Sequence, residues 1–234
     1  MAKIGFLGCS YSAYNQKNVQ ENSWTYQLAE KFPQHQYYSY ALGGRGVDYL
    51  QWCLLDAKEQ DLDVIFVNTT YPSRVSYLVD SEWASNDFTF EDTKITENFK
   101  LREFSSSHIW SSHGSIGNQE IYKPLGKYFQ GAIDFQCTSE NRKTYIKKFY
   151  KNIKNLYNFK HIILLNFVSP DGHDDTTTVI SQMWDHFEVN NQTQAYHAGL
   201  VLALDDDHWT FKGNQWVLNN FILNKETIDI LNHI

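Results

Sequence analysis

The chain has 234 residues, of which 42% are hydrophobic and 20% charged, and its formal net charge is -7. These values are typical of a soluble globular protein with one α/β domain over residues 1–234, and the acidic balance argues against nucleic acid as a partner. No apolar run is long enough to span a membrane and no signal-like segment follows Met1, so we expect a cytoplasmic protein.

The first predicted element is a buried strand that ends in Ser10, within the stretch Lys3–Ser12, whose apolar run stops abruptly at Gly8-Cys9-Ser10. Short apolar runs of this kind are typical of central parallel strands, and ligands bind beyond the carboxyl ends of such strands. Ser10 is therefore a candidate catalytic residue. The alternative is that Gly8 and Ser10 only shape a turn and cap a following helix.

Cys9 is a second candidate nucleophile, because a thiolate needs less activation than a hydroxyl. Neighbouring residues of a strand point to opposite faces, so only one of Cys9 and Ser10 can easily face a catalytic base. The other cysteines, Cys53 and Cys137, share no Cys-x-x-Cys spacing with it. This usage indicates a reducing compartment, and we expect no zinc site and no cofactor.

Strands and helices alternate in the next part of the chain. Helical spacing of apolar residues predicts a helix over residues 21–32, which Pro33 ends. A second strand follows at Tyr37–Leu42, a helix at Val47–Lys58 and a third strand at Asp63–Val67. Gly43 and Gly44 lie where the second strand gives way to a helix, so their N–H groups either point at an anion or simply form a tight turn.

Hydrophobic periodicity is lost from Tyr71 to about Cys137. We expect this stretch to contain short helices, among them Leu101–Ser107, and to form a cap insertion over residues 75–137 at the C-terminal edge of the sheet. It is rich in aromatic residues. Their rings either form a small core of the cap or offer faces on which sugar rings and acyl groups stack.

Helix and strand alternate again after the cap. The clearest predicted helix covers Ser139–Tyr157, the apolar run His161–Val168 is a fourth strand, and further helices are predicted at Thr178–Phe187 and Asn214–Leu231. Right-handed crossovers between such strands build a parallel sheet with helices on both faces, for which we expect the strand order 2-1-3-4-5. Ser169–Asp175 has metal-like residues in a turn-like pattern, so we predict no metal site there.

Asp205 and His208 stand three residues apart in the loop that follows Ala198–Leu204. This spacing lets the carboxylate fold back on the imidazole and hold one tautomer, so that the other ring nitrogen can take a proton from a serine. The alternative is a solvated acidic loop, residues 205–207, that caps the last helix. The pairing with the N-terminal Gly8-x-Ser10 favours the catalytic interpretation.

Together these segments resemble the SGNH (GDSL-like) hydrolase family. Gly8-Cys9-Ser10-Tyr11 is similar to its first block, Gly-Asp-Ser-Leu, and Asp205-x-x-His208 to its last block. Ala41–Gly46 resembles the glycine block, whose backbone N–H helps to form the oxyanion hole. The third block, Gly-x-Asn-Asp, is missing after the third strand. A fainter likeness, to SGNH-like open reading frames of large tailed phages, rests on residues 8–11, 21–24 and 72–74.

The resemblance implies a three-layer α/β sandwich with a flavodoxin-like parallel sheet. It also implies that Ser10, rather than Cys9, is the nucleophile, with His208 as its base and Asp205 as the partner of that base. The implied oxyanion hole comprises Ser10, Gly44, Asn68 and Thr70, the last two replacing the missing block. The implied substrate contacts are Tyr11, Arg45, Arg74 and Trp209.

The sequence thus predicts a serine ester hydrolase that acts on a small acyl or acetyl ester, with an O-acetylated carbohydrate as the preferred candidate. We expect no nucleic-acid and no membrane partner. The alternative is a binding or structural protein of SGNH fold with little or no turnover. It is favoured by the missing third block and by cysteine at position 9 in place of aspartate.

Overall fold

In the computed structural model, the described residues are 1–13, 23–70, 76–78, 90–104, 109–111, 140–165, 197, 199, 201–203 and 206–234. Their centre is a six-stranded sheet in the order β5-β6-β2-β1-β3-β8. Its strands are β1 (Lys3–Leu7), β2 (Gln36–Ser39), β3 (Val64–Asn68), β5 (Phe90–Lys94), β6 (Phe99–Phe104) and β8 (His161–Leu165). Neighbouring strands are parallel, except that β5 runs antiparallel to β6. The protein therefore has an α/β fold with a mostly parallel sheet.

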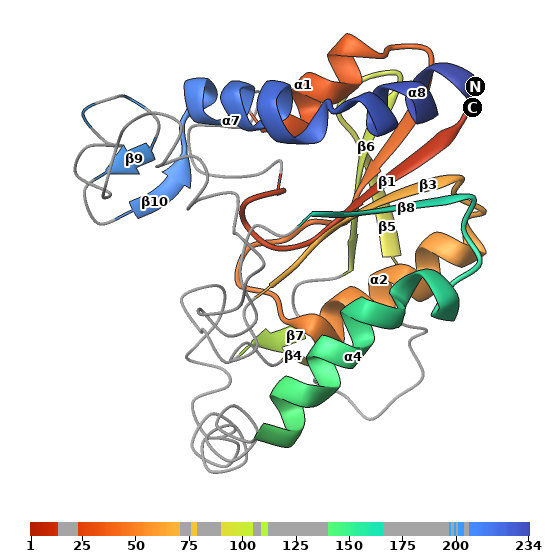
Figure 1. The fold of residues 1–234 in the computed structure, drawn as a ribbon, viewed down its shortest axis with the longest axis vertical. Helices are drawn as coiled ribbons and strands as arrows, with labels where there is room; N and C mark the ends of the chain where they lie inside the picture. Colours follow the sequence, from red (N-terminus) through yellow and green to blue (C-terminus); the bar gives the residue numbers. More distant parts are fainter. Residues whose placement is uncertain are drawn as a thin grey trace.

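Helices cover both faces of this sheet (Figure 1). One face carries α1 (Trp24–Lys31), α7 (Phe211–Val217), the short π-helix η2 (Leu218–Ile222) and α8 (Lys225–His233). The other face carries α2 (Val47–Glu59) and α4 (Glu140–Leu156). Two small antiparallel sheets pair β4 (Ser76–Leu78) with β7 (Ile109–Ser111) and β9 (Val201–Ala203) with β10 (Asp206–Trp209). Within the described part of the chain, every helix is too short or too polar to cross a membrane.

The central strands are apolar because both of their faces are buried. Phe6 of β1 and Phe66 of β3 lie in one core, where both rings contact Trp24 of α1 at centroid distances of 5.3 and 6.0 Å. The alternate residues Leu7 and Val67 lie in the opposite core, with the apolar residues of α2 and α4. A strand that is covered on both faces reads as a continuous apolar run, which is the pattern of these segments.

The observed strand order confirms the predicted neighbours of four strands. β2, β1, β3 and β8 follow the predicted order 2-1-3-4, and β3 lies inside the sheet. Among the described residues, no fifth parallel strand pairs with β8. Val201–Ala203 pairs instead with β10, antiparallel and in a separate sheet, and β6 extends the main sheet on the far side of β2.

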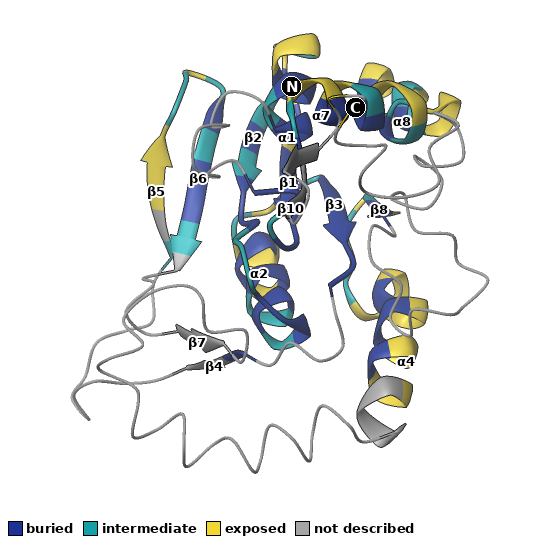
Figure 2. Ribbon diagram, turned by 90° about the vertical axis from the view of Figure 1, so that its left-hand side faces the viewer, coloured by how far each residue is buried: buried dark blue, intermediate teal, exposed yellow. Residues whose placement is uncertain are grey.

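Residues 90–104 do not follow the predicted cap. They form β5 and β6 at the edge of the main sheet, and the predicted helix from Leu101 is wrong, because Leu101 lies in a strand. Phe99 and Leu101 are buried beside β2, so burial and strand pairing outweigh local pattern here. β4 and β7 lie beyond the ends toward which β2, β3 and β6 point (Figure 2). The rest of the predicted cap, and the predicted helix at Thr178–Phe187, lie outside the described residues.

The predicted last helix is divided in the structure. It begins earlier than expected, at Phe211, because the Thr210 hydroxyl accepts a hydrogen bond from Gly213 N at 3.1 Å and caps α7. It is interrupted after η2, where Asn224 caps α8 by accepting a hydrogen bond from Thr227 N at 2.9 Å. Side chains of threonine and asparagine are preferred at such caps because they satisfy the free N–H groups of a first turn.

A buried charge cluster fastens β5 and β6 to α2. Arg102 of β6 donates to both carboxylate oxygens of Asp56, at 2.6 and 2.8 Å, and to Asp92 of β5 at 2.8 Å. The Tyr40 hydroxyl also donates to Asp56, at 2.8 Å. These contacts raise the pKa of the Arg102 guanidinium, mainly through the hydrogen bonds with Asp56. The cluster holds the edge of the sheet against the helix layer.

We expect Arg102→Met to lower the free energy of unfolding by about 3–5 kcal/mol, because it leaves the buried Asp56 carboxylate without its counter-ion. Lys100→Met is the matched control on the same strand, since Lys100 pairs with Asp92 at the surface and such pairs contribute about 0–1 kcal/mol. Urea denaturation of both variants measures the difference. Equal losses for the two would show that the Arg102 cluster does not stabilise the fold.

Candidate active site

The candidate site is built on the loop that follows β1, and its first residue must be glycine. Gly8 has a φ of +155°, and a Cβ atom placed on it would lie 2.6 Å from Cβ of Asn68 at the end of β3. That distance is far below any ordinary contact, so a larger residue would push the ends of the two strands apart. Gly8 therefore lets the first predicted block lie directly against Asn68, which stands where the resemblance would place the missing third block.

The two candidate nucleophiles have different surroundings. Cys9 is fully buried and belongs to the hydrophobic core beneath α1 and α7, whereas Ser10 is only half-buried. The chain then makes one tight turn, in which Ser12 N and Ala13 N donate to the Cys9 carbonyl oxygen at 3.0 and 3.2 Å. Because the thiol faces the core, Ser10 is the better placed of the two for chemistry.

The glycine block lies directly beside this loop. Leu42 N donates to the Gly8 carbonyl oxygen at 3.2 Å, which continues the pairing of β2 with β1 past the ends of both strands. Gly44 follows two residues later with a φ of +73°, a conformation that glycine adopts without strain. Ser10 and Gly44 thus each stand two residues beyond a shared backbone contact, and the oxyanion hole expected between their N–H groups stays a prediction.

The two proposed side-chain donors after β3 are already engaged. Thr70 donates its hydroxyl proton to the Arg45 carbonyl oxygen at 2.7 Å, so it is not positioned as an oxyanion donor and instead holds the glycine block in place. Its backbone N donates to the Tyr150 hydroxyl of α4 at 3.1 Å, and burial raises the pKa of that hydroxyl. Asn68 is fully buried and donates through Nδ2 to Cys9 Sγ at 3.6 Å.

The segment that carries His208 docks against the loop that carries Ser10. In β10, Trp209 is buried, and its ring lies 5.0 Å from the ring of Tyr11, centroid to centroid. Since Ser10 precedes Tyr11 and His208 precedes Trp209, this contact brings the first and last predicted blocks together from opposite ends of the chain. Both rings belong to the hydrophobic core beneath α1 and α7, so their role is packing rather than the predicted substrate contact.

A buried amide locks this contact in place. Asn214 of α7 donates to the carbonyl oxygens of Trp209 and Thr210 at 3.1 and 3.0 Å, and its Oδ1 accepts a hydrogen bond from Trp24 N at 3.0 Å. The Trp24 indole in turn donates to the Tyr11 carbonyl oxygen at 3.1 Å. Hydrogen bonds therefore join the start of α1 to the loop after β1 and, through Asn214, to the end of β10. They hold the segments with Ser10 and His208 next to each other.

Sequence reasoning missed Asn214 and Trp24 as supports of the site. The predicted last helix begins at Asn214, and Trp24 lies within the predicted helix over residues 21–32, so neither residue is singled out by the sequence as part of the site. A signal was present in the sequence, since an asparagine in the first turn of a helix is placed to bond backbone groups. Its contact with Trp24 could not be read from the sequence, because Trp24 lies 190 residues away in the chain.

The other predicted site residues fall into two groups. Arg45 is buried, with its guanidinium carbon 5.9 Å from the centre of the Tyr49 ring, and burial lowers its pKa, so its surroundings are those of a packed residue rather than an exposed substrate contact. Asp205, Arg74 and Cys137 lie outside the described residues, as do the segment Ser169–Asp175 and the side chain of His208. The predicted contacts of Asp205 with His208, and of His208 with Ser10, therefore stay predictions.

Comparison with known proteins adds no relative. No protein-family model matches the chain, and no curated protein is significantly similar to it.

Proposed function

We propose that this protein is a serine ester hydrolase of the SGNH type, with Ser10 as nucleophile. The observation that supports the proposal is the contact between Tyr11 and Trp209, whose rings are 5.0 Å apart. It joins the serine-containing loop to the segment with His208, although nearly the whole chain separates them. A catalytic serine and histidine that are far apart in the sequence must be brought together by packing of their segments. The contact between Tyr11 and Trp209 packs these two segments on each other.

In the proposed mechanism, His208 takes the proton of the Ser10 hydroxyl as Ser10 Oγ attacks the ester carbonyl. Asp205 holds the imidazole in the tautomer that leaves Nε2 free to accept this proton. The N–H groups of Ser10 and Gly44 stabilise the negative oxygen of the tetrahedral intermediate. Collapse of the intermediate expels the alcohol, which takes the proton from His208. A water molecule, activated by the same histidine, then attacks the acyl-serine and releases the acid.

The proposed substrate is a small acyl or acetyl ester, with an O-acetylated carbohydrate preferred. This preference comes from the family resemblance and from the aromatic residues of the segment between residues 75 and 137. An oxyanion hole with only backbone donors is compatible with turnover, since loss of one donor typically costs about 10²–10³-fold in rate. A small ester with a good leaving group is therefore the first substrate to test.

The second candidate function is binding without turnover, and one observation favours it. Thr70 gives its hydroxyl proton to Arg45, and Asn68 donates to Cys9, so both side chains proposed for the third block are turned to structural contacts. A protein that kept the fold and lost the donor would bind an ester or a glycan and release it unchanged.

Covalent labelling distinguishes the two functions. A fluorophosphonate reacts with a serine only when a neighbouring base activates its hydroxyl. We expect stoichiometric labelling, located by mass spectrometry on Ser10 and abolished in Ser10→Ala. Ser12 in the same peptide is an internal control, because its side chain is fully buried. Absence of labelling at Ser10 in the folded protein would favour the binding function.

A further inference from the structure

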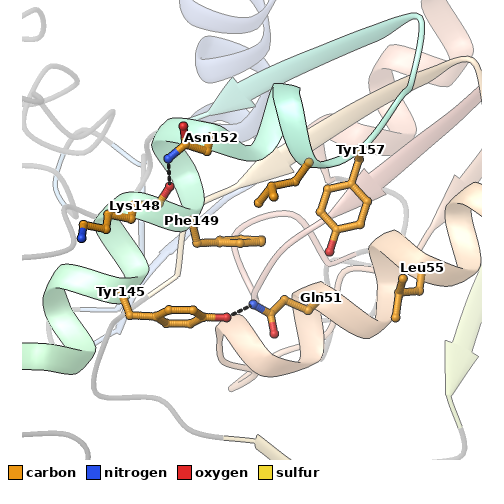
Figure 3. A pocket seen from close by; sticks show the side chains of 8 residues that line it. Gln51, Leu55, Tyr145, Lys148, Phe149, Asn152 and Tyr157 are labelled. Atoms are coloured by element: carbon orange, nitrogen blue, oxygen red, sulfur yellow. Dashed lines mark hydrogen bonds between the residues drawn. The ribbon is translucent and has the colours of Figure 1, made fainter.

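A groove runs along the outer side of the α2–α4 layer (Figure 3). It has a volume of about 610 Å³, and its walls come from one face of each helix. Gln51 Nε2 donates to the Tyr145 hydroxyl and bridges the two helices at one end, and Phe149 lies between them. Leu55 and Tyr157 line the other end. The groove is separate from the proposed catalytic site, to which none of these residues belongs.

The walls of this groove are apolar and open to solvent. Leu55, Tyr145 and Leu156 are 57%, 49% and 59% exposed, and they are three of the six large hydrophobic side chains exposed among the described residues. Large apolar side chains that gather on one surface mark an interaction site rather than chance exposure. Because the walls are this open, a small molecule would remain half in water, whereas a helix laid along the groove would cover all three side chains.

The rim of the groove is basic in a protein that is acidic as a whole. Lys148 lines the groove, Lys151 follows it on the same helix, and residues 144–156 contain no acidic residue, although the net charge of the chain is -7. Lys58 of α2 is already engaged: its ammonium donates to the Asn158 carbonyl oxygen at 2.7 Å and lies 5.6 Å from the centre of the Phe159 ring. The ion pairs between described residues involve none of these three lysines.

We propose that the α2–α4 groove is a docking site for an acidic amphipathic helix of a partner protein. Apolar side chains spaced at i, i+4 and i+7 would enter the groove, and carboxylates beside them would face Lys148 and Lys151. The groove extends over the eleven residue steps from Tyr145 to Leu156, about 17 Å at a rise of about 1.5 Å per residue, which accommodates three such anchors.

Two other occupants fit this surface less well. In a symmetric pair of copies, each copy presents the same patch to the other, so the lysines of one copy would face a second basic surface, which is electrostatically unfavourable. An anionic lipid surface would also attract the lysines. However, a helix that binds a membrane inserts a protruding apolar face into the acyl region. Here the surface is a groove, because Phe149 lies between the two helices and is only 5% exposed, so it is shaped to receive a helix rather than to enter a bilayer.

The test is binding of a synthetic fluorescein-labelled peptide of about 18 residues, with leucines on one helical face and glutamates elsewhere. By fluorescence anisotropy at low salt, we expect saturable binding to the whole protein that weakens as salt is added. Two double variants test the groove. The first combines Leu55→Ser with Leu156→Ser, and the second combines Lys148→Glu with Lys151→Glu. Each pair is expected to weaken binding at least about tenfold.

Matched controls lie in the opposite helix layer. Phe211→Ser removes a comparably exposed apolar side chain, 48% exposed, and Lys31→Glu with Lys225→Glu reverses two exposed charges. Both are expected to leave the dissociation constant within about twofold, since they lie outside the groove. A peptide of the same composition without an apolar face, and one with lysine in place of glutamate, are expected not to bind.

Three results would overturn the proposal. The first is acidic-peptide binding that the groove variants leave unchanged. The second is equal binding of the shuffled or the basic peptide. The third is sedimentation with phosphatidylserine vesicles that the Lys148 and Lys151 changes abolish while peptide binding is absent, which would assign the surface to a membrane instead. Because every substituted side chain is exposed, loss of binding in a variant with unchanged circular dichroism reports on the groove itself.

Discussion

Ser10→Ala is expected to reduce the hydrolysis of p-nitrophenyl acetate by at least about 10³-fold, because it removes the proposed nucleophile while leaving the surrounding backbone intact. Ser10 is half-buried in the loop after β1. Initial rates at several substrate concentrations, measured on freshly folded protein, give kcat/KM for the variant and the parent.

Cys9→Ala is the matched control for this experiment. The thiol is fully buried in the hydrophobic core and lies 3.6 Å from Asn68 Nδ2, so its loss should lower stability slightly and leave most of the activity. The reverse outcome, in which Cys9→Ala abolishes hydrolysis and Ser10→Ala does not, would identify Cys9 as the nucleophile. The loop after β1 would then have to change conformation so that the Cys9 thiol leaves the core.

The pH dependence of kcat/KM is expected to identify the base. An imidazole that accepts a proton must be neutral, so the rate should rise with pH through the ordinary titration range of histidine, around pH 6.5. His208→Ala should abolish this step together with at least about 10³-fold of the rate. Asp205→Asn should lower the apparent pKa of the step, because the carboxylate favours the charged imidazole, and should reduce the plateau about 10³–10⁴-fold.

His197→Ala is the control for these two variants, since His197 lies in the same part of the chain and its side chain is exposed. It should leave both the pH profile and the plateau unchanged. Activity that survived His208→Ala and Asp205→Asn with the parent's pH profile would place the chemistry elsewhere, and His108 and His113 would be the next histidines to replace.

Much of the central sheet could be predicted because its strands carry a strong local signal. β1 and β3 are buried on both faces and therefore read as uninterrupted apolar runs, and the helices between the strands show apolar residues at helical spacing. β6 could not be predicted in the same way. Its residues Lys100, Arg102 and Glu103 give no apolar run, and Arg102 is stable inside the protein only because Asp56 and Asp92 neutralise it.

The candidate site was predictable in its residue types and less so in their roles. Gly8 and Ser10 lie where the strand pattern indicated. Asn68, the last residue of β3, and Thr70, two residues later, are the expected oxyanion donors, yet their hydrogen bonds go to Cys9 and Arg45. The acceptor of a side-chain hydrogen bond depends on which residues of other helices and strands lie nearby in the fold. The sequence of one segment does not predict those residues.

The sequence by itself determined the α/β class, the order of four strands and the place of Gly8-Cys9-Ser10 just beyond β1. These features follow from short-range rules, namely the period of apolar residues, the conformations open to glycine and the handedness of crossovers. Only the tertiary structure decided that Cys9 faces the core, that Tyr11 packs on Trp209, and that Asn214 joins both segments to α1. The reason is physical: such contacts are made between residues as far apart as Tyr11 and Trp209, which 198 positions separate, and they form only where the packed helices and strands bring them within reach.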